Sequence, residues 1–170
     1  MSRHRRGNGG RCRDGSLKAW DVRTDACVLS SETAAPTTAL LRLADGAIAS
    51  GHSDGCMRVW DVRGGAGAGA AAATLSGHEA GHVMFGLAQL PDGRVCSASR
   101  DATVRVWSLA TRTCVGVVAS APAPLHRSCV TADGRLAVAC GDGTARVHVV
   151  DAATATATAA ATTAAAAAAE

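Results

Sequence analysis

Residues 77–107 read GHEAGHVMFGLAQLPDGRVCSASRDATVRVW, and they contain the most complete pattern of turns and strands in the chain. It starts with a Gly-His pair, turns at Asp92-Gly93 and again at Asp101, and ends at Trp107. Between these marks, short runs alternate apolar with other residues, a period of two that is typical of half-buried β-strands. The stretch therefore predicts short strands joined by tight turns.

The same punctuation recurs along the chain at a nearly constant interval. A turn aspartate stands six residues before a tryptophan or histidine at four places: Asp14 before Trp20, Asp54 before Trp60, Asp101 before Trp107 and Asp142 before His148. The closing residues of these units are separated by 40, 47 and 41 residues. A period near 40–45 residues indicates the blades of a β-propeller, each made of four strands.

At these residues the chain resembles the WD40-repeat family, because Trp20-Asp21, Trp60-Asp61 and Gly77-His78 lie in register. The resemblance covers residues 14–150. It implies an all-β fold, a WD40-like β-propeller fragment of four-stranded antiparallel blades that form an incomplete ring. The first repeat lacks its two leading strands, so we expect about three and a half repeats, which belong to a larger propeller.

Three biased segments flank or interrupt the repeats. Residues 1–13 carry five Arg and no acid, which predicts a disordered basic tail. Residues 64–73 form a Gly/Ala insertion, and residues 151–170 form a low-complexity Ala/Thr tail. Nucleic-acid binding through the Arg-rich tail is an alternative function. Without its five Arg, however, 12 of the 17 basic residues remain against 14 acidic ones, which makes nucleic acid an unfavourable partner for the repeats.

The rest of the composition limits the protein class. No apolar run approaches the ~20 residues of a membrane span, and no apolar core of a secretory signal follows the N-terminus. The seven Cys are odd in number and form no C-x-x-C pair, so we interpret them as thiols buried in strands. We expect a soluble intracellular protein, cytoplasmic or nuclear, with no membrane contact and no cofactor or metal.

One motif within residues 77–107 favours a different chemistry. His78, Glu79 and His82 fit the pattern H-E-x-x-H, in which two histidines on one helix face hold zinc and the glutamate activates water. Gly77 and Gly81 disfavour such a helix. A zinc-dependent hydrolase is therefore an alternative function, and we prefer a structural role for His78 and no enzymatic activity.

The resemblance implies that structural role. In WD40 blades a histidine, a strand serine, the turn aspartate and the strand tryptophan form a hydrogen-bonded network, which here corresponds to His78, Ser97 or Ser99, Asp101 and Trp107. Only the third repeat has the full set. The other repeats keep parts of it: Asp14 and Trp20 in the first, Ser50, Asp54 and Trp60 without the Gly-His element in the second, and Asp142 with His148 in the fourth.

The resemblance also implies a function, a non-catalytic scaffold that binds other proteins or peptides. In the family, the turns between second and third strands and the inter-blade loops form a common contact surface. The corresponding candidates are His52, Ser53, Glu79, His82 and Arg100. End blades with unpaired strand edges also predict self-association through the open edges of the propeller.

Overall fold

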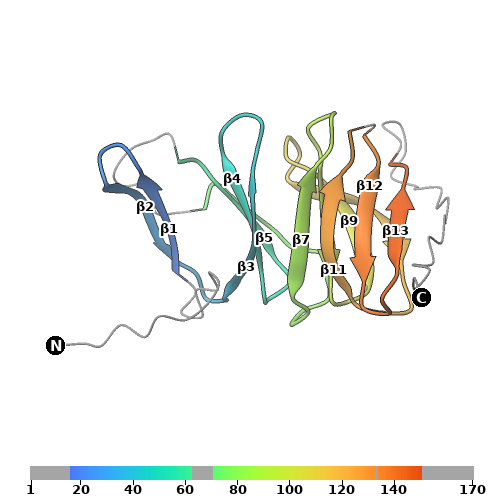
Figure 1. Cartoon of the computed structure of the whole chain (residues 1–170). Coiled ribbons are helices and arrows are strands. Elements are labelled where there is room, and N and C mark those ends of the chain that lie inside the picture. The colour runs from blue at the N-terminus through green and yellow to red at the C-terminus, as the bar shows by residue number, and fades with distance from the viewer. Residues whose placement is uncertain (1–15, 63–70, 133, 151–170) are drawn as a thin grey trace, which may run out of the picture.

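The structure is a computed structural model that describes residues 16–62, 71–132 and 134–150 (Figure 1). The described residues form strands β1–β13 joined by turns. They include no helix that is long and apolar enough to cross a membrane. Every strand pairing is antiparallel, and the strands group into four separate sheets that follow one another along the chain.

We name these sheets blades 1 to 4 in chain order. Blade 1 pairs β1 (Ser16–Asp21) with β2 (Ala26–Glu32). Blade 2 contains β3 (Thr37–Arg42), β4 (Ile48–His52), β5 (Met57–Trp60) and β6 (Ala73–Leu75). Blade 3 contains β7 (Met84–Gln89), β8 (Val95–Ser99), β9 (Thr103–Ser108) and β10 (Thr113–Ser120). Blade 4 contains β11 (Leu125–Val130), β12 (Leu136–Cys140) and β13 (Ala145–His148).

The prediction of an all-β fold with four-stranded antiparallel blades is confirmed, since blades 2 and 3 are such sheets. Each is a meander in which neighbouring strands are consecutive in sequence. Within the described residues, blade 1 has two strands and blade 4 has three. Ala73, which we assigned to the Gly/Ala insertion, begins β6, whereas residues 64–70 and the two terminal tails lie outside the described residues.

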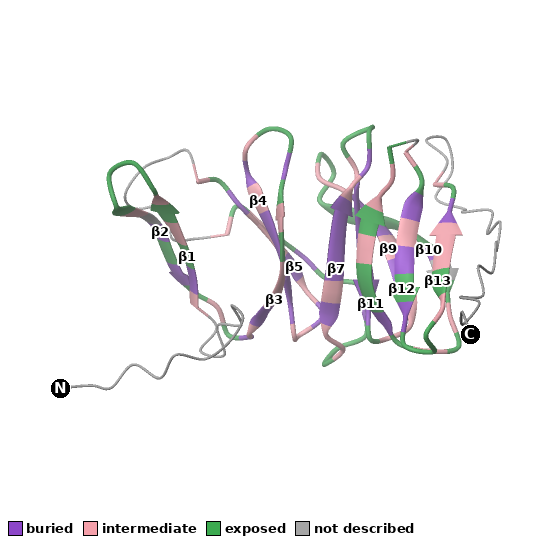
Figure 2. Ribbon diagram, viewed as in Figure 1, coloured by how far each residue is buried: buried purple, intermediate pink, exposed green. Residues whose placement is uncertain are grey.

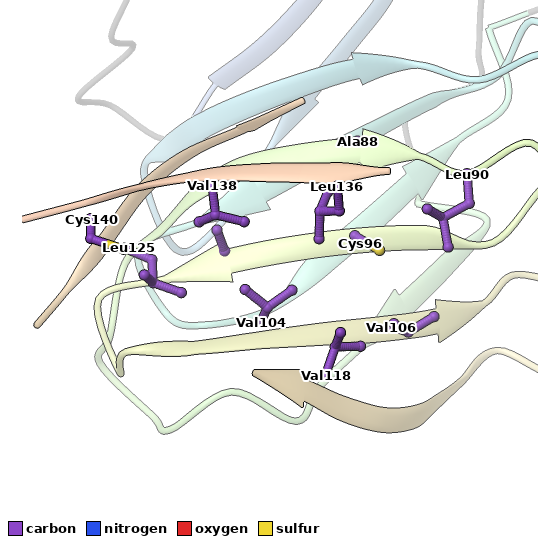
Figure 3. Packing of buried hydrophobic residues seen from close by; sticks show 11 residues of the cluster. Ala88, Leu90, Cys96, Val104, Val106, Val118, Leu125, Leu136, Val138 and Cys140 are labelled. Carbon is purple, nitrogen blue, oxygen red and sulfur yellow. The ribbon is translucent and has the colours of Figure 1, made fainter. Parts of the chain in front are cut away.

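Apolar side chains hold the blades together at the contacts between them. One cluster joins blades 3 and 4, where Val104 and Val106 of β9 pack with Leu136 and Val138 of β12 (Figure 3). A second cluster joins blades 2 and 3 and includes Trp107. A smaller one joins blades 1 and 2. Burial is therefore deepest in blade 3, which is covered on both sides, and shallowest around the β1–β2 turn (Figure 2).

Candidate functional site

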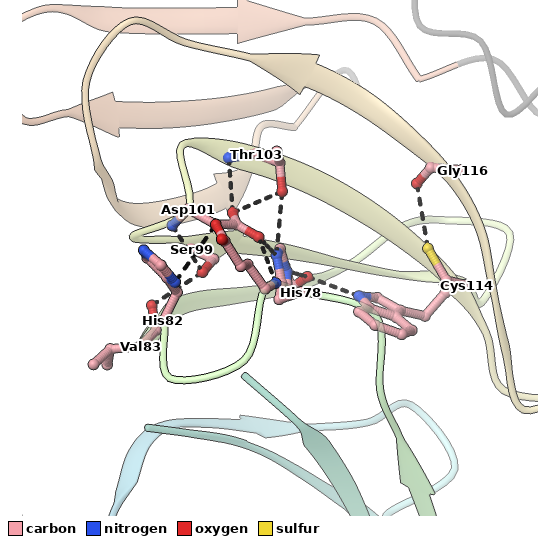
Figure 4. Close-up of polar contacts among 11 residues, drawn as sticks. His78, His82, Val83, Ser99, Asp101, Thr103, Cys114 and Gly116 are labelled. Atoms are coloured by element: carbon pink, nitrogen blue, oxygen red, sulfur yellow. Dashed lines mark hydrogen bonds and ion pairs between the residues drawn. The ribbon is translucent and has the colours of Figure 1, made fainter. Parts of the chain in front are cut away.

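Blade 3 contains one continuous chain of buried hydrogen bonds (Figure 4). The indole N–H of Trp107 donates to Ser97 Oγ over 2.7 Å, and Ser97 Oγ lies 2.6 Å from His78 Nε2. His78 Nδ1 lies 2.7 Å from a carboxylate oxygen of Asp101. The inter-blade loop, β8, the β8–β9 turn and β9 each supply one member. The structure thus brings together His78, Ser97, Asp101 and Trp107.

A single neutral tautomer of His78 satisfies this chain. With the proton on Nδ1, the ring donates to Asp101 and its Nε2 accepts the Ser97 hydroxyl proton, while Ser97 Oγ accepts from Trp107. Burial lowers the pKa of His78 below its ordinary value, even though the hydrogen bond to Asp101 raises it. Protonation would turn Nε2 into a donor and displace the Ser97 hydroxyl proton from its acceptor. The network of blade 3 therefore favours the neutral form of the His78 imidazole.

Asp101 is the anchor of the network. Its carboxylate accepts hydrogen bonds from the Thr103 hydroxyl at 2.7 Å, from the Thr103 backbone N–H at 2.9 Å and from the Glu79 N–H at 3.1 Å. Burial raises the pKa of Asp101, but the bonds from Thr103 and His78 outweigh it and lower the pKa to about 2. Ser99, the alternative to Ser97, instead donates to the Val83 carbonyl.

Blade 2 builds the same chain with a histidine that we had assigned elsewhere. Trp60 donates to Ser50 Oγ over 2.7 Å, and Ser50 Oγ lies 2.7 Å from His52 Nε2. His52 Nδ1 lies 3.1 Å from the Ala35 carbonyl oxygen. Our prediction that His52 belongs to a partner-binding face is wrong, because its side chain is fully buried. Ser50 and His52 are two residues apart on β4 and so point to the same side of the strand.

Asp54 has no histidine to bind in this arrangement. Its carboxylate pairs instead with the Arg58 guanidinium at 2.7 Å and accepts the Cys56 backbone N–H at 2.9 Å. Burial opposes ionisation, but the bonds from Arg58 and Cys56 hold the pKa of Asp54 below its ordinary value. Our prediction that Asp54 belongs to the histidine network is therefore wrong. Asp54 instead stabilises a turn and forms an ion pair with Arg58.

Blade 4 keeps only the turn. Asp142 accepts from the Thr144 N–H at 2.9 Å and from the Thr144 hydroxyl at 2.6 Å, as Asp101 accepts from Thr103 in blade 3. Among the described residues, however, its carboxylate pairs with Arg146 and with no histidine. His148 faces Leu136, as Trp107 faces Val95. The residue two positions further along β12 is therefore Val138, where blade 3 has a serine. Within the described chain the buried Nδ1 of His148 has no hydrogen-bond partner.

Blade 1 departs furthest from the expectation. Trp20 is 56% exposed, whereas Trp60 and Trp107 are 1% and 0% exposed. The pairing of β1 with β2 shifts register between Ala19 and Trp20, and no described strand lies on the other side of β1. Trp20 is thus no member of a buried network. Asp14 lies outside the described residues.

The remaining face candidates gather where blades 2 and 3 meet. The turn after β4 packs on the loop before β7, since a Cβ on Gly55 would lie 2.9 Å from the Glu79 carbonyl oxygen. The Arg100 backbone N–H donates to the Val83 carbonyl at 2.9 Å and joins the β8–β9 turn to the same loop. The structure thus places Ser53, Glu79, His82 and Arg100 on three adjoining segments.

The side chains on these segments differ in exposure. Arg100 is exposed and the Glu79 side chain is 72% exposed, whereas the His82 side chain is 38% exposed and lies 3.7 Å from the Glu79 carboxylate. Ser53 is half-buried, and its N–H donates to the Pro36 carbonyl. We call this surface, formed by Ser53, Glu79, His82 and Arg100, the blade 2–3 face.

The H-E-x-x-H pattern does not form the site that zinc hydrolysis needs. Residues 78–82 form a bend and a turn, closed by a His82 N–H to Glu79 carbonyl bond, and not a helix. Both ring nitrogens of His78 are engaged by Asp101 and Ser97. Among the described residues, no three His, Cys, Asp or Glu side chains are grouped to hold a metal ion. The zinc alternative therefore has no geometric support.

Comparisons with known proteins agree with this geometry. The family model described as "WD domain, G-beta repeat" matches residues 69–108, which end one residue after Trp107. The fold is similar to a crystal structure of the WD40 β-propeller domain of Doa1, with a TM-score of 0.69 and 23% identity over 83% of this chain. The chain spans about half, 46%, of that structure. The comparison with curated proteins finds no match. Residues 69–108 thus form a repeat of the WD-domain family, and the described blades have the fold of a WD40 β-propeller.

Proposed function

We propose that the chain is a non-catalytic scaffold, and that it binds other proteins or peptides through the blade 2–3 face. WD40 propellers are in general interaction scaffolds without chemistry of their own, and the likeness of this chain to them supports the same role here. Our proposal further assigns the blade 2–3 face as the surface at which this chain binds its partners. Its partners act inside the cell, where the six described free cysteines remain reduced.

The proposal rests mainly on one observation. The turn after β4, the loop before β7 and the β8–β9 turn contact one another directly above the hydrogen-bonded network of blade 3. Beneath the loop, the His78–Asp101 pair and the Glu79 N–H bond to Asp101 fix the backbone. Above it, Glu79 and Arg100 present opposite charges to solvent. Exposed loop residues that a buried network holds in one position lose little conformational freedom when a partner binds.

The test uses two charge reversals on one blade. Arg100→Glu changes the blade 2–3 face, whereas Arg112→Glu changes an exposed arginine in the turn at the other end of β9. The immobilised chain is exposed to a cell extract, and bound proteins are quantified by mass spectrometry. We expect Arg100→Glu to reduce recovery of the main partners by about tenfold, the effect of one well-placed interface arginine. Arg112→Glu should keep them. Equal recovery with both variants would remove the blade 2–3 face from the proposal.

A further inference from the structure

Blades 2, 3 and 4 each carry an arginine at the same position of the sheet. Arg58, Arg105 and Arg146 all follow the turn aspartate of their blade by four residues and precede its closing residue by two. Each lies opposite the central residue of the neighbouring strand, which is β4, β8 or β12. Because their places in the blades agree, the surroundings of the three side chains can be compared directly.

In blades 2 and 4 this arginine forms an ion pair with the turn aspartate. The Arg58 guanidinium lies 2.7 Å from the carboxylate of Asp54, and the Arg146 guanidinium lies 3.8 Å from that of Asp142. A position four residues further along the chain, across a tight turn, thus brings the side chain back to the aspartate. In both blades the turn carboxylate supplies the counter-charge of the arginine.

Blade 3 leaves its arginine without this partner. The carboxylate of Asp101 instead accepts hydrogen bonds from His78, from Thr103 and from the Glu79 N–H. Among the described residues, no carboxylate forms an ion pair with Arg105. The Nε of Arg105 is buried and has no hydrogen-bond partner there. The network that anchors blade 3 therefore leaves one cation without a counter-charge.

Arg105 lies next to the segments that form the blade 2–3 face. Its side chain is half-buried, and it lies two residues after Thr103, whose hydroxyl is 3.2 Å from His78 Nδ1. It shares with Thr103 and Trp107 the side of β9 that packs on blade 2, since residues two apart on a strand face the same way. Burial is the main cause that lowers the pKa of His78, and the charge of Arg105 lowers this pKa further. The cation is therefore close to the histidine that begins the loop of the face.

The charges of the face indicate what would neutralise Arg105. Arg100, on the same β8–β9 hairpin, is exposed and adds a second positive charge. A guanidinium binds a carboxylate through two parallel N–H donors, which makes it selective for this group. The Glu79 side chain, 72% exposed, opposes a continuous polyanion such as nucleic acid, because like charges repel across an interface. A peptide segment with separated carboxylates meets both conditions.

We propose that the Arg105 guanidinium is the subsite for an aspartate or glutamate side chain of the protein that binds the blade 2–3 face. The inference rests on the proposed scaffold function and names the chemistry of its partner, an acidic peptide segment. The partner carboxylate takes the place that Asp54 and Asp142 occupy beside the arginines of blades 2 and 4. Arg100 strengthens the attraction at the rim of the face.

The test measures fluorescence anisotropy of a short labelled peptide in which glutamates are separated by glycine and serine. We expect saturable binding that weakens as salt is raised, and at least about tenfold weaker binding of the matching glutamine peptide. Arg105→Gln should weaken binding of the glutamate peptide by at least about tenfold. The control Arg112→Gln removes the same charge at the other end of β9 and should leave this binding unchanged. Equal affinity of both peptides for the wild-type chain would overturn the proposal, whichever variants fold.

Two further measurements locate the contact. In NMR spectra of the arginine side chains, the Nε–H signal of Arg105 should shift when the glutamate peptide is added, and that of Arg112 should not. In urea unfolding, Arg105→Gln should lose less stability than Arg58→Gln, because only Arg58 gives up an ion pair. The reverse order would show that Arg105 serves the blade itself and would overturn its assignment as a binding residue.

The outcomes separate this subsite from the proposed function. Partner capture that depends on Arg100, together with no binding of the glutamate peptide, would refute the Arg105 subsite and leave the scaffold function standing. Peptide binding that depends on Arg105, with no protein captured through the blade 2–3 face, would refute the scaffold function alone. Tighter, Arg105-dependent binding of a labelled single-stranded oligonucleotide would overturn the choice of a protein carboxylate as the occupant.

Discussion

Blades 2 and 3 make the same buried hydrogen-bonded chain from histidines that come from different places. In blade 3 the histidine comes from the loop before β7 and ends the chain on the carboxylate of Asp101. In blade 2 it comes from the end of β4 and ends the chain on the backbone carbonyl of Ala35. The tryptophan and serine keep the same positions, with indole-to-hydroxyl distances of 2.7 Å in both blades.

The two blades share one requirement for their stability. The required element is a hydrogen-bond acceptor for the serine hydroxyl beneath the tryptophan, and the origin of the histidine is secondary. Once His52 supplies that acceptor, Asp54 is released to pair with Arg58. The carboxylate is therefore an anchor in blade 3 and a turn residue in blade 2, although the two sequences look alike at this position.

The largest expected effect tests this difference between the aspartates. Asp101→Ala leaves His78 Nδ1–H, the Thr103 hydroxyl and two backbone N–H groups without their acceptor, and should lower the free energy of unfolding by about 3 kcal/mol. Asp54→Ala, at a 32% exposed side chain, should cost about 1 kcal/mol. Urea unfolding followed by tryptophan fluorescence measures both. Equal losses would mean that the blades do not differ as described.

The serines test what the blades share. Ser97→Ala and Ser50→Ala each leave a buried indole N–H and a histidine nitrogen unpaired, and each should cost about 2 kcal/mol. Because the hydroxyl binds a tryptophan and a histidine in both blades, and the further contact of Ser50 with the Arg58 carbonyl is long at 3.4 Å, the two losses should agree, unlike those of the aspartates. A markedly smaller loss for Ser50→Ala in urea unfolding would show that the blade 2 chain is the weaker one.

Acid should destabilise both blades through their histidines. Burial lowers the pKa of His52 and His78 from 6.5, so below pH 6.5 the unfolded chain binds more protons than the native chain, and stability falls with pH. The pKa of Asp101, lowered to about 2 from 3.8, adds a second loss below pH 3.8. The melting temperature should drop between about pH 7.5 and pH 5.5, by several degrees for each ~1 kcal/mol lost. A flat melting temperature over this interval would contradict the neutral state of these rings.

Blade 4 differs from blades 2 and 3 in that it has no serine hydroxyl beneath the closing residue of the blade. His148 is 5% exposed and its Nδ1 has no partner in the described chain, because Val138 occupies the serine position. His148→Leu should therefore raise the free energy of unfolding by about 1 kcal/mol. The control His52→Leu should lower it, since it deprives Ser50 Oγ and the Ala35 carbonyl of their partner. A loss of stability in both variants would show that His148 has a structural role of its own.

Strands and turns were predictable because their signals are local. Turn aspartates at a fixed distance from the closing residue give the register, and the turns predicted at Asp92-Gly93 and Asp101 lie between β7 and β8 and between β8 and β9. The blade 3 network was predictable for the same reason, since its members follow the family's spacing. The surrounding apolar clusters then form from the alternation of each strand.

The features that the sequence did not reveal depend on contacts between distant residues. The role of His52 requires the Ala35 carbonyl, 17 residues away, although the placement of His52 two residues after Ser50 on a strand was a usable signal. The exposure of Trp20 depends on which strands lie beside β1.

The smallest expected effect concerns the turn beside the anchor. Ala102 has a φ of 63°, whereas the corresponding residues of blades 2 and 4 are Gly55 and Gly143, with φ of 80° and 84°. Only glycine adopts this left-handed region without steric cost. Ala102→Gly should therefore stabilise the chain by about 0.5 kcal/mol, the relief of strain being partly offset by the greater entropy of the unfolded chain. Gly143→Ala, where a Cβ would meet open space, should lose about as much. Opposite shifts of similar size in urea unfolding would show that Ala102 is strained in the turn of blade 3, and a loss at Ala102→Gly would show that the alanine is not strained.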